Sequence, residues 1–383
     1  MSDPLFLYGT LCHPPLLRIV LGRDAETRPA CLSGHRVMWV ENAAFPVIEP
    51  CEGGVAEGLL LSGLTKADMA RLDFYEGGYG YRTHAVTVTT ETGPCASRVY
   101  MPEPGRFTAA APWSLSDWVR QWGALTCRAA EEAMGYMGRK TPEELAAIFP
   151  AIRTRAAAWL AGKAENRTGG GLTMPPAGRP VETRDLRRPY AAFFAIEEHD
   201  LVVPRFADRP PVEMRRAVFM SADAALVLPY DPATDRVLVT EQFRAGPHAR
   251  GEAQAWTLEP VAGRVDPGET PEAAAHREGA EEAGLTFRAL IPVSRCYPSP
   301  GASSEYYHLF LGLTDLPEAT DHIGGLAGEG EDIRSHVFDA TRFIEMCDTG
   351  RIWVAPLVLM GHWLARHRDG LRAQASATVA TKP

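Results

Sequence analysis

The stretch AENRTGGGLTMPPAGRPVETRDLRRP, residues 164–189, is the feature that most constrains how this chain folds. It is rich in Gly, Pro and charge and offers almost nothing apolar to bury, which is typical of a linker. The chain has 383 residues, more than one hydrophobic core usually supports. We therefore expect two domains joined by a linker at 164–187.

Before the linker, short β-type runs such as LFLY, HRVMWV, EGLLLSGL and THAVTVTT alternate with Gly, Pro and Asn. They predict a small strand-rich unit over residues 1–110. The period then becomes helical in residues 112–137 and 141–163, where Ser114 or Ser116 and Thr141 are candidate N-caps. We expect residues 111–163 to form a helical extension.

After the linker, apolar strand patterns (AALVLPYD, RVLVTEQF and HLFLGLTD) enclose an acidic helix, and the segment VAPLVLMGHWLARHRDG predicts a closing helix. This order is typical of an α+β or α/β/α domain, which we place at residues 188–375.

A formal net charge of −9 argues against a nucleic-acid partner or an anionic membrane surface, since both need a basic field. The seven cysteines lie far apart without a C-x-x-C pair, which fits reduced thiols in a cytoplasm. The start, MSDPLFLYGTLCHPP, lacks a leader pattern, and no later run has membrane-spanning length. We expect a soluble cytoplasmic protein with no membrane partner.

The segment GRVDPGETPEAAAHREGAEEAGL, beginning at Gly263, holds six carboxylates. Thr270 and Pro271 predict a helix start. On that helix Glu278, Glu281 and Glu282 emerge within about 5–6 Å of each other and repel unless a cation lies between them. Oxygen ligands of this kind indicate Mg²⁺ or Mn²⁺ with a phosphate substrate, whereas the alternative is a solvated helix face.

The spacing of this segment resembles the Nudix box, G-x5-E-x7-R-E-U-x-E-E-x-G-U, of hydrolases that cleave nucleoside diphosphates linked to another group. Gly263, Glu269, Arg277-Glu278 and the run from Glu281 to Leu285 stand at the required positions. One position departs, because Gly279 replaces an aliphatic residue. A helix-interior Gly costs about 1 kcal/mol relative to Ala and removes a core contact, so the packing of the helix is in question.

Three further segments are similar to the ADP-ribose pyrophosphatase branch of that family: RRAVFMSADAALVLPYDPATDRVLVTEQFRAG, YPSPGASSE and GLAGEGEDIRSHVF. Together they cover most of residues 188–370. The resemblance implies an α/β/α sandwich and a homodimer formed through this domain.

The resemblance also implies roles for individual residues. Glu278 and Glu282 would bind metal with the Ala262 carbonyl, and Glu281 would belong to the same metal shell. Arg277 would orient the glutamates from behind, with Glu269 beside it. Of Glu329 and Glu331, one would be the base that activates water and the other an added metal ligand; the sequence leaves their order open.

Substrate contacts are implied in the same way. Arg244 is a candidate for the pyrophosphate, with a surface arginine as the alternative. Phe194 and Arg216 would hold the base from a partner subunit, although an aromatic such as Phe194 also suits a core. Three further residues lie where the family contacts substrate: Ser299, Gly301 and Glu305.

The implied reaction is ADP-ribose plus water giving AMP and ribose 5-phosphate, with two or three Mg²⁺ ions lowering the pKa of the attacking water. One alternative is the same chemistry on another nucleotide sugar, such as GDP-mannose. A second alternative, of a different class, is a binding or stress-response protein whose sites are relics.

The N-terminal unit carries a second resemblance. Tyr8-Gly9-Thr10-Leu11 stands at a strand-to-turn transition, and Glu76 lies in the Gly-rich aromatic turn RLDFYEGGYGYRT, where desolvation would raise its pKa. The pair is similar to the gamma-glutamylcyclotransferase (AIG2-like) fold, small and β-barrel-like, with its Y-G-S/T-L and L-D-x-x-E-G motifs. The resemblance implies that the loop holds a glutamyl group and that Glu76 moves the proton. Catalysis and scaffolding both stay open for this unit.

The fusion of the two domains resembles a bacterial group labelled tellurite-resistance proteins, a label that names a phenotype.

Overall fold

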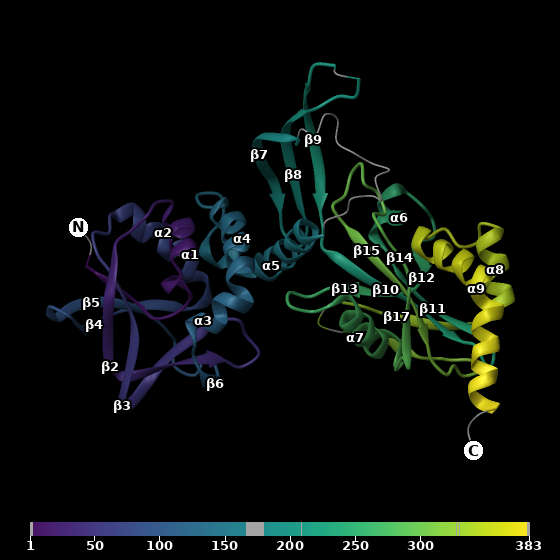
Figure 1. Cartoon of the computed structure of the whole chain (residues 1–383), viewed down its shortest axis with the longest axis horizontal. Coiled ribbons are helices and arrows are strands. Elements are labelled where there is room, and N and C mark those ends of the chain that lie inside the picture. The colour runs from purple at the N-terminus through teal and green to yellow at the C-terminus, as the bar shows by residue number, and fades with distance from the viewer. Residues whose placement is uncertain (1–2, 166–179, 208, 327, 329, 381–383) are drawn as a thin grey trace. The chain divides into compact units, whose positions relative to one another are not determined.

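The computed structural model describes residues 3–165, 180–207, 209–326, 328 and 330–380. Its contacts divide the chain into two compact units, Met1–Asn166 and Arg167–Pro383. Each unit has its own sheet structure (Figure 1), and each has its own hydrophobic core. No helix among the described residues is long and apolar enough to cross a membrane.

A closed barrel forms the centre of the N-terminal unit. Its sheet has the strand order β3-β1-β5-β4-β2-β6, and pairing of β2 with β3 closes the ring. The long β2–β3 hairpin sets the register from Thr27 opposite Leu61 to Trp39 opposite Pro46. The strands are β1 (Leu5–Leu7), β2 (Thr27–Val40), β3 (Pro46–Leu61), β4 (Tyr81–Thr90), β5 (Gly93–Pro102) and β6 (Ala109–Pro112).

Alternating side chains fill the barrel, because successive strand residues point to opposite faces. Phe6, Leu32, Leu60, Val88 and Val99 share this core and are almost entirely buried. The expected β-barrel-like unit is thereby confirmed.

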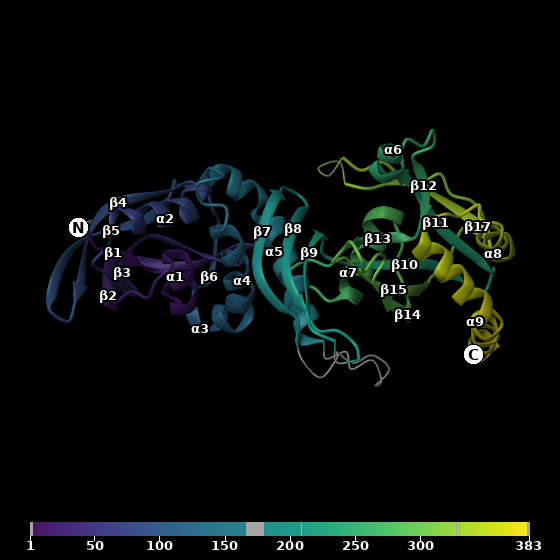
Figure 2. The same cartoon turned by 90° about the horizontal axis from the view of Figure 1, so that it is seen from above.

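Helices pack on the barrel within the same unit (Figure 2). Thr141 caps the longest of them by accepting a hydrogen bond from the Glu144 amide, and Ser114, not Ser116, caps α3. Trp118 is fully buried, whereas Trp159 is exposed. The helical elements are η1 (Thr10–Cys12), α1 (Pro14–Leu21), α2 (Lys66–Glu76), η2 (Gly77–Tyr79), α3 (Leu115–Trp118), the π-helical turn η3 (Val119–Gly123), α4 (Ala124–Met134) and α5 (Pro142–Ala164).

The end of the predicted linker, residues 164–187, is part of a strand, because β7 begins at Glu182. An antiparallel three-stranded sheet holds this strand in the order β7-β8-β9, and it consists of β7 (Glu182–Ala191), β8 (Ala195–Val203) and β9 (Val212–Met220). Cross-strand ion pairs replace apolar alternation here: Asp200 accepts from Arg187 at 3.0 Å and from Arg215 at 2.6 Å. The charges that indicated a linker therefore stabilise a sheet.

A mixed sheet forms the body of the C-terminal unit, in the order β14-β15-β10-β11-β17-β16, with β12 on β11 and β13 on β10. β10 and β15 run parallel, so a crossover containing the acidic helix connects them. The strands are β10 (Asp223–Asp231), β11 (Arg236–Phe243), β12 (Trp256–Glu259), β13 (Val261–Arg264), β14 (Ala289–Cys296), β15 (Tyr306–Leu313), β16 (Ile323–Gly324) and β17 (Ile333–Asp339).

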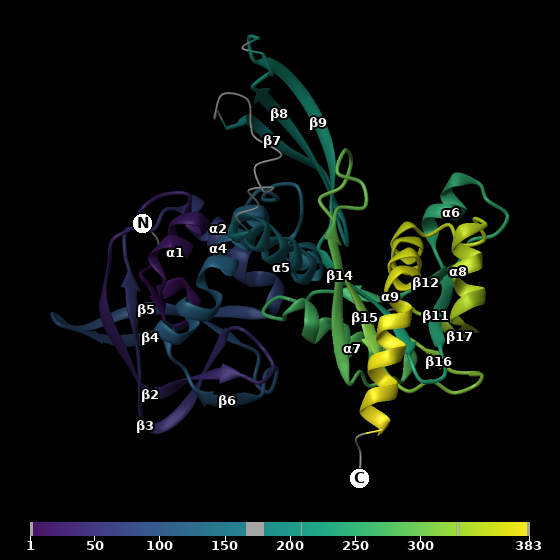
Figure 3. The same ribbon diagram turned by 45° about the vertical axis from the view of Figure 1, so that its right-hand side comes forward.

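Helices cover both faces of this sheet (Figure 3). Ala225, Val227 and Leu238 pack toward α7 (Pro271–Ala283), while Leu226, Leu228 and Val239 pack toward α8 (Ala340–Asp348) and α9 (Ala355–Ala380). This confirms the expected α/β/α sandwich. A short helix, α6 (Ala245–Arg250), follows β11.

Candidate active site

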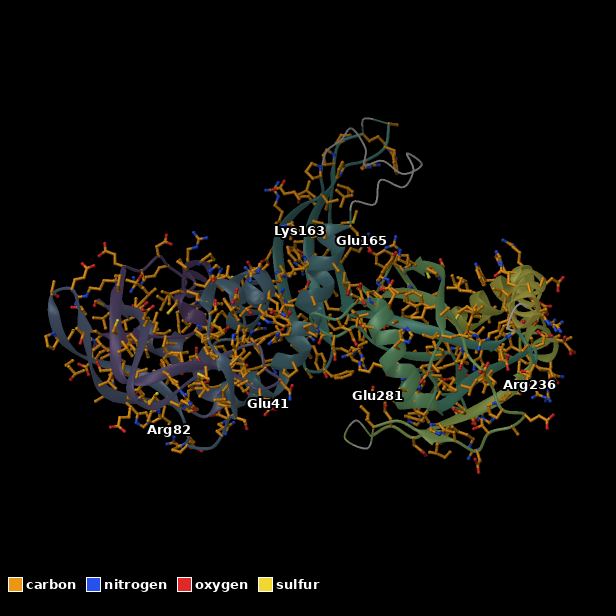
Figure 4. The ribbon with its side chains drawn as sticks, turned by 60° about the horizontal axis from the view of Figure 1, so that its bottom comes forward. Glu41, Arg82, Lys163, Glu165, Arg236 and Glu281 are labelled. Carbon is orange, nitrogen blue, oxygen red and sulfur yellow. The ribbon has the colours of Figure 1, made fainter. Side chains whose placement is uncertain are left out.

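The acidic helix α7 begins where its sequence predicts. The Thr270 hydroxyl accepts a hydrogen bond from the Ala273 amide at 3.1 Å, and Pro271 occupies the first turn. Gly284 ends the helix in the left-handed conformation, with φ of +64°. Because the start and the end of α7 are set, the direction in which each of its carboxylates points is also set. Figure 4 labels one of them, Glu281.

Gly279 turns out to be required by packing. A Cβ at this position would lie 2.4 Å from Cε2 of Phe287, a residue that is 4% exposed. The ring fills the space that an aliphatic side chain would take, so the expected loss of a core contact is wrong. The helix keeps its packing through a residue outside it.

Two carboxylates of α7 close on the backbone of β13. The Ala262 amide donates to Oε2 of Glu282 at 3.0 Å. A Cβ at residue 263 would lie 1.7 Å from Oε1 of Glu278, so only Gly263 allows this approach. Glu282 is 2% exposed, and both carboxylates adjoin the Ala262–Gly263 peptide.

The electrostatics of this pair are unfavourable without a cation. Burial raises the pKa of Glu278 to about 6, against the opposing charge and hydrogen bond of Arg277. Burial also raises the pKa of Glu282 to about 8, and the charges of Glu278 and Glu331 add to the rise. Desolvated acids of this kind mark functional sites.

Arg277 connects the carboxylates behind the pair. Its Nη1 donates to Oε1 of Glu278 at 2.6 Å and to Oε2 of Glu281 at 3.1 Å. Its Nε and Nη2 grip the two oxygens of Glu269, and Nη2 also donates to the Arg264 carbonyl. The sequence predicts that Arg277 and Glu269 lie behind the glutamates. In the structure Arg277 contacts Glu269, Glu278 and Glu281. Glu282 does not contact Arg277 and accepts a hydrogen bond from the Ala262 amide instead.

The loop before β17 approaches the same carboxylates. The charge of Glu331 acts on Glu278, Glu282 and Arg244, and its Oε2 accepts from the Leu326 amide at 3.2 Å. Close contact holds β16, which leads into this loop, to α7, because a Cβ at Gly324 would lie 2.0 Å from the Glu282 carbonyl oxygen. Glu329, the other candidate base, lies outside the described residues.

The donor set has the chemistry of a divalent-cation site. Two desolvated carboxylates beside a backbone peptide offer the hard oxygen ligands that Mg²⁺ and Mn²⁺ take. Within the ranges that the structure describes, no group of three or more His, Cys, Asp or Glu side chains has the arrangement of a complete metal cage. The Arg277 hydrogen bonds explain part of this, because they draw Glu278 and Glu281 toward the guanidinium.

Arg244, the candidate for the pyrophosphate, lies in an ion pair at the end of β11. Its Nε lies 2.9 Å from Oε1 of Glu259 and its Nη2 lies 2.6 Å from Oε2, a two-pronged contact. The charges of Glu282 and Glu331 act on the same guanidinium. Arg244 therefore lies within electrostatic reach of Glu282 and Glu331.

Glu305 lies near the same arginine. Burial raises its pKa, although it accepts from Tyr307 at 3.1 Å and feels the charges of Arg264 and Arg244. Ser299 and Gly301 belong to an exposed turn in which the Ser299 carbonyl accepts from the amides of Ala302 and Ser303. Glu305 is thus within electrostatic reach of Arg244, whereas Ser299 and Gly301 lie on an exposed turn.

The β7–β8 hairpin carries the aromatic candidate. The Phe194 ring lies 4.5 Å from that of Phe219, and the Arg264 guanidinium lies 3.8 Å from the centre of Phe193. Arg216 is exposed on β9 and donates to the Arg215 carbonyl. The contact between Arg264 and Phe193 was not predicted from the sequence. The one available signal was the position of Arg264, which directly follows Gly263, the first glycine of the box.

In the N-terminal unit, Glu76 ends α2 among tyrosines. Burial raises its pKa to about 7, and its charge acts on the hydroxyls of Tyr8, Tyr75, Tyr79, Tyr81 and Tyr100. Tyr100 donates to Asp73 at 2.5 Å. The Tyr8–Leu11 segment reaches this region, because the side chains of Tyr8 and Tyr81 are hydrogen bonded.

The sequence was compared with known proteins. Residues 220–350 match the family described as "NUDIX domain". The ADP-ribose pyrophosphatase of Escherichia coli K12 is 36% identical over 183 residues, which are 48% of this chain and 87% of that protein. The chain belongs to the Nudix hydrolase family.

Two further relatives of this Nudix protein differ in their named substrate. The ADP-ribose pyrophosphatase of Haemophilus influenzae is 34% identical over 46% of this chain and 81% of its own length. The GDP-mannose pyrophosphatase of Cronobacter sakazakii is 30% identical over 40% of this chain and 78% of its own length. Residues 5–120 of the Nudix protein match the family described as "Gamma-glutamyl cyclotransferase, AIG2-like".

Proposed function

We propose that the C-terminal domain hydrolyses the diphosphate of ADP-ribose to AMP and ribose 5-phosphate. The observation that carries the proposal is the desolvated pair Glu278 and Glu282, which closes on the Ala262–Gly263 peptide. The relatives named for ADP-ribose, at 34% and 36% identity, support this substrate over GDP-mannose, whose named relative is 30% identical.

Glu278, Glu282 and the Ala262 carbonyl would hold Mg²⁺ or Mn²⁺, with Glu281 and Glu331 as further oxygen donors. When bound, such an ion neutralises the diphosphate and lowers the pKa of water. The burial of Glu278 and Glu282 supports this assignment, because desolvated acids gain most from a cation.

The chain's own residues would then orient the reactants. Arg277 fixes Glu278 through Nη1 while Glu269 holds the guanidinium from the other side. Arg244, held by Glu259, presents its charge to the diphosphate. A carboxylate of the loop 328–331, either Glu331 or Glu329, accepts the proton of water as the new O–P bond forms and the bridging P–O bond breaks.

We also propose that the active form is a homodimer in which Phe194 and Arg216 contact the base. The support is the exposure of large apolar side chains near the hairpin, with Tyr190 at 57% and Phe193 at 62%. Sedimentation velocity tests this: a single monomeric species at micromolar protein would contradict it.

For the N-terminal domain we propose proton transfer by Glu76 on a glutamyl substrate held near Tyr8, Gly9, Thr10 and Leu11. A carboxyl with a pKa of about 7 can both accept and return a proton at neutral pH. We place both activities in the cytoplasm, since all seven cysteines are free thiols.

The experiment that tests the main proposal compares kcat/KM for ADP-ribose and GDP-mannose with Mg²⁺ and full-length protein. We expect a clear preference for ADP-ribose. Cleavage of GDP-mannose with ADP-ribose left intact would contradict the proposal, and cleavage of neither would favour the interpretation of the site as a relic.

A further inference from the structure

Helix α5 carries Arg153 to the turn that holds Glu76. Phe149 and Arg153 are four residues apart and therefore share one face of the helix. The Phe149 ring lies 6.3 Å from that of Tyr75 and 5.8 Å from that of Tyr79, which flank Glu76 in the sequence. The helix also touches the turn through its backbone, since a Cβ at Gly78 would lie 2.0 Å from the Pro142 carbonyl oxygen.

Arg153 differs from its neighbours because no acceptor in the described part of the chain meets its guanidinium. Its guanidinium carbon lies 5.3 Å from the centre of the Trp122 ring, and its charge acts on Tyr75 and Tyr79. Burial lowers the pKa of Arg153. Arg155, two residues on, instead pairs with Glu132 at 2.6 Å. The guanidinium of Arg153 is thus half-buried beside an aromatic ring and has no acceptor among the described residues.

Tyr79 presents a second donor without a partner. Its hydroxyl oxygen is buried and makes no hydrogen bond to any described residue. The charges of Glu76 and Arg153 both act on this hydroxyl. Two unsatisfied donors, one from α5 and one from η2, therefore lie beside the same aromatic cluster.

The cluster reaches solvent, as a binding site requires. Glu76, Tyr79, Trp122 and Arg153 are each half-buried. Trp122 belongs to the π-helical turn η3, a rare conformation that is frequent at functional sites. The aromatic faces would cover an apolar body while the two donors bind its charged end.

We propose that Arg153 and Tyr79 bind a carboxylate of a small amino-acid-like ligand whose other end lies toward Glu76. The planar guanidinium fork matches the two oxygens of a carboxylate. A multiply charged phosphate fits less well, because Glu76 adds negative charge to the same cluster. The inference deepens the candidate function of the N-terminal domain but concerns binding, so it stands even if Glu76 catalyses nothing.

Isothermal titration of the full-length protein with 5-oxoproline, L-glutamate and the neutral 5-oxoproline amide tests it. We expect one of the two acids to bind saturably and the amide to bind at least about tenfold more weakly. Arg153→Gln should weaken binding of the acid about tenfold or more, and Arg153→Lys, which keeps the charge but loses the fork, should weaken it less.

Two variants separate binding from folding. Tyr79→Phe removes a hydroxyl that has no described partner, so the fold should be kept while binding of the acid weakens several-fold. Arg128→Gln is the matched control, because Arg128 also lies over a tryptophan, Trp159 at 4.5 Å, but pairs with Glu131. Binding that is absent for both acids, equal for acid and amide, or unchanged in folded Arg153→Gln would overturn the proposal.

Discussion

Arg277 holds Glu269 through two hydrogen bonds, from Nε to Oε1 at 3.1 Å and from Nη2 to Oε2 at 3.0 Å. The remaining nitrogen, Nη1, donates to Glu278 at 2.6 Å. One guanidinium thus joins the loop before α7 to a carboxylate that the proposed metal needs. Because the fork is planar and rigid, its geometry sets where Glu278 points.

Arg277→Lys should lower kcat by about 10–100-fold, as losses of such supporting contacts typically do, with KM for ADP-ribose changed little. A lysine keeps the charge but cannot hold Glu269 and Glu278 together. Arg288→Lys, at an exposed pair with Asp315, is the matched control. Equal kcat for wild type and Arg277→Lys would show that the fork has no such role.

Glu282→Gln should abolish the stabilisation by Mg²⁺. Ligand at about 100 times its dissociation constant stabilises a fold by about 2.7 kcal/mol, which raises the Tm by several degrees. The Gln oxygen can still accept from the Ala262 amide, so the metal-free fold should survive. Glu272→Gln on the exposed face of the same helix is the control. An equal Mg²⁺-dependent Tm rise in wild type and Glu282→Gln would contradict the assignment.

Gly279→Ala should destabilise the C-terminal domain by about 1–3 kcal/mol despite its better helix propensity, because the new Cβ collides with Phe287. Gly370→Ala, where a Cβ would meet no atom within 4 Å, should stabilise α9 by about 0.5–1 kcal/mol. Thermal unfolding of both variants checks the opposite signs. A stabilised Gly279→Ala would mean that Phe287 moves aside at little cost.

The pH dependence of stability should report on Glu76. Its folded pKa of about 7 lies above the ordinary 4.5, so its contribution is fully present below pH 4.5 and is lost as the pH rises through 7. The loss amounts to at most about 3 kcal/mol. Unfolding of wild type and Glu76→Gln between pH 4 and 8 should therefore show a steeper decline for wild type. Parallel curves for the two proteins would refute the raised pKa.

Local signals in the sequence were enough for the acidic helix and for the positions of Glu278 and Glu282 on it. The helix start depends on Thr270 and Pro271, which act within one turn. The spacing from Gly263 to Leu285 lies within one turn and one helix, so it directly predicts that Glu278 and Glu282 share a helix face. The strands of both domains could also be predicted, because a strand that is buried on one face alternates apolar and polar residues.

Tertiary packing decided what the sequence did not predict. Phe287 fills the space at Gly279 from beyond the helix end, and Arg264 meets Phe193 only after the β7–β8 hairpin folds. β7 itself is stabilised by cross-strand ion pairs, so its composition matched a linker. Arg153 and Tyr79 lie far apart in the sequence and come beside the same aromatic cluster only because α5 packs on η2.

Mass spectrometry of the products from ADP-ribose and Mg²⁺, with wild type beside Glu282→Gln, tests the central claim most directly. The account predicts AMP and ribose 5-phosphate in equal amounts from wild type and almost none from the folded Glu282→Gln variant. Intact ADP-ribose after incubation with wild type, or equal products from both proteins, would contradict it.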